Sequence, residues 1–334
     1  MYLILVLASF LLSLLSVALI KQRFNQQLLD IPNERSSHTQ PTPRGGGLGF
    51  IIAFALTSGS AAILARYFPD SFHNQLIYPN LSWLWLILTP LAIVGIIDDQ
   101  RGVPAGLRYL VQLAVSAIAV ACFGAFFLPW LTDFGMIGQM AAIAGTCIGM
   151  TALINFYNFM DGLDGLVAGV SAVQLSFLAI YLNQPILWLL VAALLGFLWW
   201  NWSPAKIFMG DAGSTVLGAI IATSLLNTHS DPIPAWSAIA ITLPLVADAI
   251  YTLTRRLIRR ENIFKAHRTH LYQRLQQSGW SHAQVASAYI AITLLVACSI
   301  YYLGSAGAWL SLVSVAGSII LGEIYLRIHS SVSK

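Results

Sequence analysis

Residues 1–20 read MYLILVLASFLLSLLSVALI and contain no charged side chain. A helix of about 20 apolar residues is long enough to cross the hydrocarbon core of a bilayer, so this stretch predicts a membrane-spanning helix. No basic residue precedes Lys21, and no small-residue cleavage site stands out. We therefore expect the stretch to be a span and not a cleaved signal peptide.

Apolar runs of the same kind recur along the whole chain of 334 residues. Hydrophobic residues make up 57% of the chain and charged residues only 9%, against about 25% charged residues in soluble proteins. This composition excludes a water-soluble domain and a disordered chain. Because no linker or repeat separates the runs, we expect one all-α polytopic membrane domain over residues 1–334. The runs predict eleven spans, with ten as the alternative count: 1–20, 47–65, 81–97, 107–129, 137–154, 166–182, 185–200, 213–229, 235–254, 286–303 and 307–326.

The basic residues predict the orientation of these spans. If the N-terminus lies on the periplasmic side, all of the 17 Lys and Arg residues except Arg66 fall on the cytoplasmic side, as the positive-inside rule requires. The formal net charge of +4 then indicates anionic partners at the cytoplasmic face. No nucleic-acid-binding motif is present, so we expect the lipid bilayer, and no nucleic acid, as a partner.

Acidic residues gather on the same predicted side. Each of them abuts an apolar stretch, and a carboxylate next to hydrocarbon is costly unless it is paired or binds a metal ion. Acids that converge at one membrane face therefore predict a divalent-cation site or a cation pathway. The five residues are Asp98, Asp99, Asp161, Asp164 and Asp211.

Two stretches of sequence carry most of these acids. In residues 155–165, NFYNFMDGLDG, an Asn or Asp recurs every three positions, and the glycines indicate that a helix ends there. Residues 206–214, KIFMGDAGS, join two predicted spans; Asp211 is a candidate metal ligand, and Ser214 is alternatively only a helix cap. Oxygen ligands of this kind favour Mg²⁺ or Mn²⁺ over zinc.

Basic side chains on the same predicted side are suited to bind phosphate. Arg108 follows the Asp98–Asp99 pair. Residues 267–270, HRTH, lie in a long basic loop, and they predict the binding of a pyrophosphate. The first loop contains Arg35, His38, Arg44 and three glycines at 45–47. It predicts either a second phosphate contact or close packing of the glycines before a span.

The ordered set of motifs resembles the polyprenyl-phosphate N-acetylhexosamine-1-phosphate transferases, glycosyltransferase family 4, which includes the phospho-MurNAc-pentapeptide translocases. The resemblance covers about residues 25–275. The ERSSH and HRTHLYQR variants, at 34–38 and 267–274, look most like the bacterial branch that starts O-antigen chains. The motifs, in order, are DIPNERSSH (30–38), PTPRGGG (41–47), Asp98–Asp99, residues 155–165, FMGDAGS (208–214), PLVAD (244–248) and residues 267–270.

The resemblance implies a reaction at the bacterial inner membrane. The phosphate of undecaprenyl phosphate attacks the sugar-bound phosphorus of a UDP-N-acetylhexosamine, and UMP leaves. The sugar of that branch is GlcNAc or a 6-deoxy-N-acetylhexosamine such as QuiNAc or FucNAc, and the product starts O-antigen, lipopolysaccharide or other cell-wall polysaccharide synthesis. The active site faces the cytoplasm, Mg²⁺ is the cofactor with Mn²⁺ as an alternative, and a homodimer is one expected state.

The resemblance also suggests residue roles. Asp98 or Asp99 is the suggested base, but a phosphate monoester has a second pKa of about 6 and is largely ionised already. We therefore expect positioning and charge balance from this pair, with charge neutralisation as the main catalytic effect. The candidate catalytic residues are Asp98, Asp99, Asp161, Asp164 and His270. The candidate substrate-binding residues are Asn155, Asn158, Arg44, Arg108, His267 and Arg268. The candidate metal ligands are Asp211, Asn158 and Asp161.

Two other functions compete with this reading. An ion-coupled transporter would place polar residues near the bilayer midplane, whereas here the acids cluster at one face and Asp248 is the principal exception. We expect Asp248 to be paired with a neighbouring helix. A CDP-alcohol phosphotransferase would carry an Asp-Gly-x-x-Ala-Arg pattern, and no Arg follows Asp161 in that way.

Overall fold

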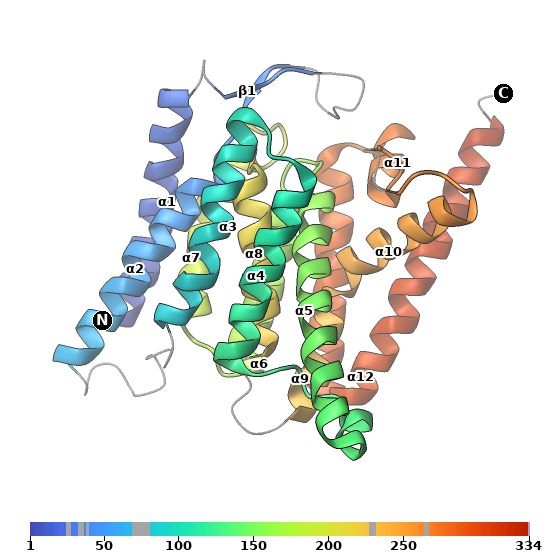
Figure 1. Ribbon diagram of the computed structural model, residues 1–334. Helices are drawn as coiled ribbons and strands as arrows, with labels where there is room; N and C mark the ends of the chain where they lie inside the picture. The colour runs from blue at the N-terminus through green and yellow to red at the C-terminus, as the bar shows by residue number, and fades with distance from the viewer. Residues whose placement is uncertain are drawn as a thin grey trace.

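The computed structural model describes residues 1–24, 28–32, 37, 40–68, 81–226, 232–263 and 267–332. The described chain is a bundle of helices, with one short antiparallel ribbon formed by β1 (Leu29–Asp30) and β2 (Thr42–Pro43) (Figure 1). The expected all-α class is therefore confirmed. The helices are α1 (Tyr2–Phe24), α2 (Gly47–Tyr67), α3 (Leu81–Arg101), α4 (Ala105–Phe123), α5 (Gly135–Met160), α6 (Leu166–Tyr181), α7 (Leu187–Asn201), α8 (Asp211–Leu226), α9 (Pro232–Ala238), α10 (Leu243–Ile258), α11 (Leu271–Gln277) and α12 (His282–Val332).

Seven helical stretches of the described chain are long and apolar enough to cross a membrane, and α6, α7 and α8 are shorter apolar helices. Helix α12 is broken at Gly304, which has φ 57° and ψ −126°, so the predicted spans 286–303 and 307–326 lie on either side of the break. The predicted span 107–129 is too long, because α4 ends at Phe123 before Gly124, whose φ is +86°. The number of spans and their orientation stay predictions.

Helix α8 lies at the centre of the bundle, between α3 and α5. Every residue of α8 from Ala212 to Leu225 is buried. Glycines permit this close packing: a Cβ on Gly218 would lie 2.8 Å from the Cα of Ile154, and a Cβ on Gly95 would overlap the backbone of Ala212. Close helix contact through small residues is typical of membrane bundles.

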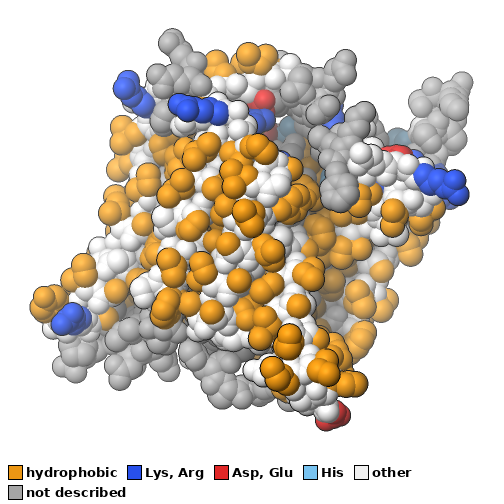
Figure 2. Space-filling view, viewed as in Figure 1, with side chains coloured by type: hydrophobic (Ala, Val, Ile, Leu, Met, Phe, Trp, Pro, Cys, Tyr) orange, Lys and Arg blue, Asp and Glu red, His pale blue; other side chains and the backbone are white. Residues whose placement is uncertain are grey.

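This packing brings the ends of three helices together on one side of the bundle. The C-terminal ends of α3 and α5 and the N-terminal end of α8 lie toward the upper side of Figure 1, where α11 also lies. Figure 2 shows hydrophobic side chains over the middle of the visible face, with Lys and Arg mainly along its upper edge. The acids of the predicted site therefore lie at one end of the bundle, as expected.

Candidate active site

Asp99, at the end of α3, is joined to the start of α8. The backbone N–H of Asp211 donates to Oδ1 of Asp99 at 3.1 Å. Since the first N–H groups of a helix have no partner within the helix, a carboxylate at this point both satisfies a donor and faces the positive end of the helix dipole. Gly210 precedes Asp211 with φ +79°, and a Cβ there would collide with the Asp99 carboxylate.

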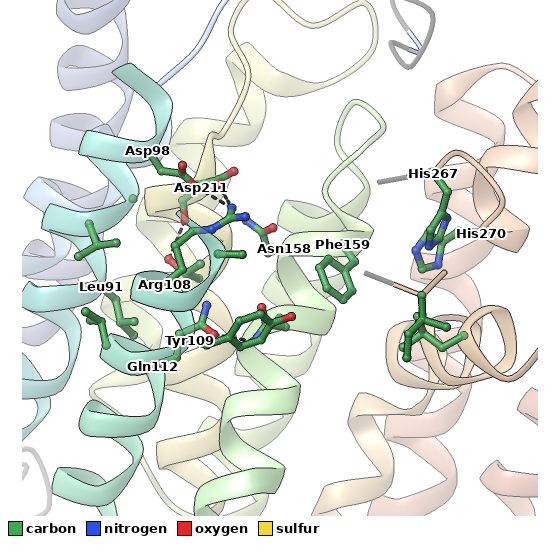
Figure 3. Close-up of a pocket in the computed structure, with 18 residues that line it drawn as sticks. Leu91, Asp98, Arg108, Tyr109, Gln112, Asn158, Phe159, Asp211, His267 and His270 are labelled. Carbon is green, nitrogen blue, oxygen red and sulfur yellow. Dashed lines mark hydrogen bonds and ion pairs between the residues drawn. The ribbon is translucent and has the colours of Figure 1, made fainter. Parts of the chain in front are cut away.

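Asp98 points to a different partner. Its Oδ2 accepts a hydrogen bond from Nη1 of Arg108 at 2.7 Å, and its Oδ1 accepts one from the backbone N–H of Val103 at 2.6 Å. The same Nη1 lies 3.4 Å from Oδ2 of Asp211 (Figure 3). Arg108 therefore links Asp98 of α3 to Asp211 of α8, whereas Asp99 contacts the backbone at the start of α8.

A cavity of about 480 Å³ opens beside these groups. Figure 3 shows Asp98, Arg108, Asn158 and Asp211 on one side of it and His267 and His270 on the other, with Phe159 between them. The cavity thus brings together acids, amides and histidines that are far apart in the chain. Its polar lining consists of Asp98, Arg108, Tyr109, Gln112, Asn155, Asn158, Asp211, Thr215, His267 and His270.

The two asparagines of the 155–165 stretch are held by neighbouring helices. Nδ2 of Asn158 donates to Oγ of Ser214 at 3.1 Å. Nδ2 of Asn155 donates to Oε1 of the buried Gln112 at 2.6 Å. Gln112 was not among the predicted site residues, although it follows Arg108 by four positions and so lies on the same helix face.

A second cavity, of about 330 Å³, lies on the loop side of the acids. Asp161, Asp164 and Arg44 line it, and Asp211 lines both cavities. Burial, and then the negative charges of Asp211 and Asp99, raise the pKa of the Asp161 carboxyl from 3.8 to about 8. The shift means that burial and the neighbouring acids both disfavour an ionised Asp161.

Asp164 and Arg44 each have a partner of their own. Oδ2 of Asp164 lies 3.2 Å from Nδ1 of His282 and accepts from the N–H of Ala205 at 3.1 Å. Nη2 of Arg44 lies 2.5 Å from Oδ2 of Asp30. His282 and Asp30 were missing from the predicted site, and no local pattern marks His282, since 118 positions separate it from Asp164.

The glycines of the first loop serve close packing. The N–H of Gly46 donates to the carbonyl of Phe208 at 2.9 Å, and that of Gly47 donates to the carbonyl of Met209 at 2.8 Å. A Cβ on Gly47 would lie 2.6 Å from the Cα of Gly213. The prediction that these glycines serve close packing is thus confirmed for Gly46 and Gly47. Arg35 and His38 lie outside the described residues.

The histidine loop lies across the larger cavity. The rings of His267 and His270 stack with their centroids 5.0 Å apart. Burial, and then the charges of His270, Arg256 and Arg255, lower the pKa of His267 to about 4. Arg268 lines neither cavity and instead donates from Nη2 to Oγ of Ser37 at 3.2 Å.

Tyr272 holds this loop against the end of α5. Its hydroxyl donates to the carbonyl of Phe159 at 3.0 Å, and a Cβ on Gly162 would overlap that hydroxyl. Tyr272 is fully buried. Tyr272 was not among the predicted site residues, and the structure gives it a packing role.

Comparisons with known proteins agree with the geometry. Residues 81–229 match the model of the family described as glycosyl transferase family 4. The chain is 29% identical to the probable undecaprenyl-phosphate N-acetylglucosaminyl 1-phosphate transferase of Bacillus subtilis, over 98% of this chain and 93% of that protein. It is 32% identical to the phospho-N-acetylmuramoyl-pentapeptide-transferase of Deinococcus radiodurans, over 75% of this chain and 82% of that protein. It is 29% identical to the undecaprenyl-phosphate alpha-N-acetylglucosaminyl 1-phosphate transferase of Yersinia pestis, over 81% and 74% respectively.

Proposed function

Because the chain belongs to glycosyl transferase family 4, we propose that it transfers an N-acetylhexosamine 1-phosphate from a UDP-sugar to undecaprenyl phosphate and releases UMP. The observation that carries the proposal is the meeting of Asp99, Asp161 and Asp211, from three separate helix ends, beside two cavities. The sugar is GlcNAc or a 6-deoxy-N-acetylhexosamine, the product starts O-antigen or a related envelope polysaccharide, and the enzyme lies in the bacterial inner membrane.

The two cavities suit two different substrates. Leu91, Val94 and Val111 contribute an apolar wall to the larger cavity, which favours the isoprenoid phosphate. The smaller cavity is lined mainly by polar groups of the loops, which favours the nucleotide sugar. Asp211 belongs to both linings, so the phosphates of the two substrates would meet beside it.

The residues around Asp211 fit a hard divalent cation. Among the described residues, no three His, Cys, Asp or Glu side chains are grouped closely enough to hold a metal ion by themselves. Mg²⁺, however, is usually bound through one or two carboxylates plus water and substrate phosphates. Burial and the nearby acids Asp211 and Asp99 raise the pKa of Asp161, and a bound cation would offset the effect of those acids. Asp211, with Asn158 or Asp161, would hold Mg²⁺ or Mn²⁺, which would neutralise phosphate charge.

The transfer forms one P–O bond and breaks another. An ionised oxygen of the lipid phosphate attacks the phosphorus attached to the sugar. The bond from that phosphorus to the bridging oxygen breaks, and UMP leaves with the electron pair. Arg108 supplies positive charge between Asp98 and Asp211, and the histidines face it across the cavity (Figure 3). The charge of Arg108 counters part of the repulsion between two anionic reactants, and the histidines are placed to donate hydrogen bonds to phosphate.

Asp98 and Asp99 are positioned as organising groups in this scheme. Asp98 accepts hydrogen bonds from Arg108 and Val103, and Asp99 accepts one from the start of α8. The pH–rate profile of Asp99→Asn tests this role. We expect a loss of rate at every pH, because the start of α8 loses the negative charge that faces it, whereas full recovery at high pH would identify Asp99 as a base.

The transporter alternative gains no support from the mid-span acid. Asp248 accepts hydrogen bonds from Leu271, Tyr272 and Tyr289, so the predicted structural pairing is confirmed. A group with this many donors is not poised to carry a mobile ion.

The experiment is a membrane assay with undecaprenyl phosphate and a panel of UDP-N-acetylhexosamines, with and without Mg²⁺ or Mn²⁺. UMP release and lipid-linked product with one donor would identify the sugar. Asp211→Asn should remove the activity, whereas the matched Asp133→Asn, at an exposed position in the turn Pro129–Phe134, should retain it. If no donor yields a lipid-linked product, the proposed function is wrong.

A further inference from the structure

Asp248, on α10, is a buried carboxylate with an unusually full set of donors. The backbone N–H groups of Leu271 and Tyr272 donate to it at 2.8 and 3.1 Å. The hydroxyl of Tyr289 donates to Oδ2 at 2.7 Å, and that of Thr252 donates to Oδ1 at 3.1 Å. Only 1% of Asp248 is exposed. These contacts hold the carboxylate in one orientation at the start of α11.

His270 lies between this carboxylate and the larger cavity. Its Nδ1 is 3.7 Å from Oδ1 of Asp248, which is within ion-pair range but beyond a hydrogen bond. Nδ1 is buried and has no hydrogen-bond partner among the described residues. Since His270 lines the cavity and its Nδ1 edge is turned to Asp248, the opposite edge, with Nε2, is left for the cavity.

We propose that Asp248 is a positioning residue for phosphate transfer, which orients His270 and balances the charge of its protonated ring so that Nε2–H donates to a substrate phosphate oxygen. The inference rests on the proposed function. It gives a function to the acid that α10 places beside the loop. The distance of 3.7 Å would shorten when substrate binds, as hydrogen bonds in empty active sites commonly do.

The other charged and titratable groups near His270 leave Asp248 as its counter-ion. His267 stacks on one side, and its pKa of about 4 keeps it neutral at pH 7. Tyr272 stacks with a centroid distance of 5.6 Å. Arg255 donates to the carbonyl of Thr269 at 2.6 Å, and the positive charges of Arg255 and Arg256 help to lower the pKa of the neighbouring His267. Among these groups Asp248 is the one anion that faces the ring of His270.

The pH–rate profile of Asp248→Asn tests the inference. The amide keeps the size of the side chain but removes its charge, so the protonated ring of His270 loses its counter-ion and a lower pH is needed to protonate it. We expect kcat at neutral pH to fall by at least about 10-fold, with the deficit shrinking as the pH is lowered. The alkaline limb of the profile should move to lower pH, and Asp248→Glu should restore part of the shift.

Tyr289→Phe is the matched control. It removes a donor to Oδ2, whereas the contact with His270 is made by Oδ1, and it leaves the charge in place. The pH profile should therefore stay that of the wild type. The double variant Asp248→Asn/His270→Gln should be no slower than His270→Gln alone, because residues that act through one another are not additive. A profile of Asp248→Asn that matches the wild type in shape would reduce Asp248 to a purely structural role.

Two further outcomes keep this test separate from that of the proposed function. If Asp248→Asn cannot be purified in a folded state, the pH–rate profile of His270→Gln tests the inference instead. The inference predicts that this variant lacks the alkaline limb seen in the wild type. An alkaline limb that persists in His270→Gln overturns the inference. If the wild-type enzyme makes no lipid-linked product with any donor, the proposed function itself has failed.

Discussion

At the scale of single residues, Gly210 shows why a small residue stands next to the candidate metal ligand. Its φ of +79° places it in a region that residues with a side chain rarely adopt, and a Cβ there would collide with Asp99. The backbone thus approaches Asp99 closely enough for the N–H of Asp211 to donate to it. The glycine therefore acts through the position of Asp211.

Gly210→Ala should abolish most of the transfer activity because the collision displaces both acids. Gly102→Ala is the control: its φ is +73°, but a Cβ there meets nothing within 4 Å. Both variants should lose about 1–3 kcal/mol of stability through backbone strain, and only Gly210→Ala should lose activity. Equal activities in UMP release would show that the contact with Asp99 is unimportant.

The raised pKa of Asp161 predicts the direction in which the stability of the fold changes with pH. Its folded pKa of about 8 lies above its ordinary value of 3.8. Between these values the folded chain holds a proton that the unfolded chain has lost, so the free energy of unfolding without a cation falls as pH rises through that window.

Binding of Mg²⁺ to ionised Asp161 should expel this proton. The affinity for Mg²⁺ should therefore rise by about 10-fold per pH unit below pH 8. Half-saturating Mg²⁺ concentrations, measured from activity at about pH 6.5 and about pH 8.5, check this. Asp161→Asn should weaken the dependence, and part of it should remain because burial and then Asp98 raise the pKa of Asp211 to about 7. An unchanged dependence in Asp161→Asn would exclude Asp161 as a ligand that must lose a proton.

Residue types in the site were more predictable than residue partners. The acids, Arg108 and the histidines stand in recognisable motifs, and the structure lines its cavities with most of them. The pairing of Asp164 with His282 depends on how segments far apart in the chain pack together. A local sequence pattern cannot predict such a contact. Arg268 donates to Ser37, which lines the smaller cavity, and its expected role in substrate binding stays a prediction.

At the scale of helices, the bundle depends on glycines where α2, α3 and α8 touch. The apolar runs predicted the helices well, because a continuous run in lipid has few alternatives to a helix. The runs predicted helix ends poorly, since Gly124 ends α4 within an apolar stretch. Contacts such as that of Gly47 with Gly213 could not be predicted, because they require the neighbouring helix.

Gly47→Ala and Gly59→Ala are a matched pair on α2. A Cβ at Gly47 would lie 2.6 Å from the Cα of Gly213, whereas one at Gly59 meets nothing within 4 Å. Gly47→Ala should cost about 1–3 kcal/mol through overpacking. Gly59→Ala should be neutral or stabilise by up to about 1 kcal/mol. Detergent-induced unfolding measures both, and equal stabilities would contradict the packing of α2 on α8.

At the scale of the whole molecule, the acids and the histidine loop lie at one end of the bundle (Figure 1). The distribution of Lys and Arg predicts that this end faces the cytoplasm. The charges along the upper edge of Figure 2 accord with that prediction. The orientation matters because a UDP-sugar would reach the site from the cytoplasm.

Cysteine labelling checks the orientation. In a variant that lacks Cys122, Cys147 and Cys298, we expect Asp133→Cys to react with a membrane-impermeant maleimide from the periplasmic side. Arg101→Cys should react only after the inner membrane is permeabilised. Both positions are exposed, so access to solvent is matched, and the reverse pattern would invert the topology.

Asp211 forms part of the wall between two chambers. If each reactant binds in its own chamber as proposed, one can enter while the other is already bound. A ternary complex can then form without a phosphorylated enzyme intermediate. Double-reciprocal plots of initial rate at several fixed donor concentrations should then intersect, whereas parallel lines would indicate that one product leaves before the second reactant arrives.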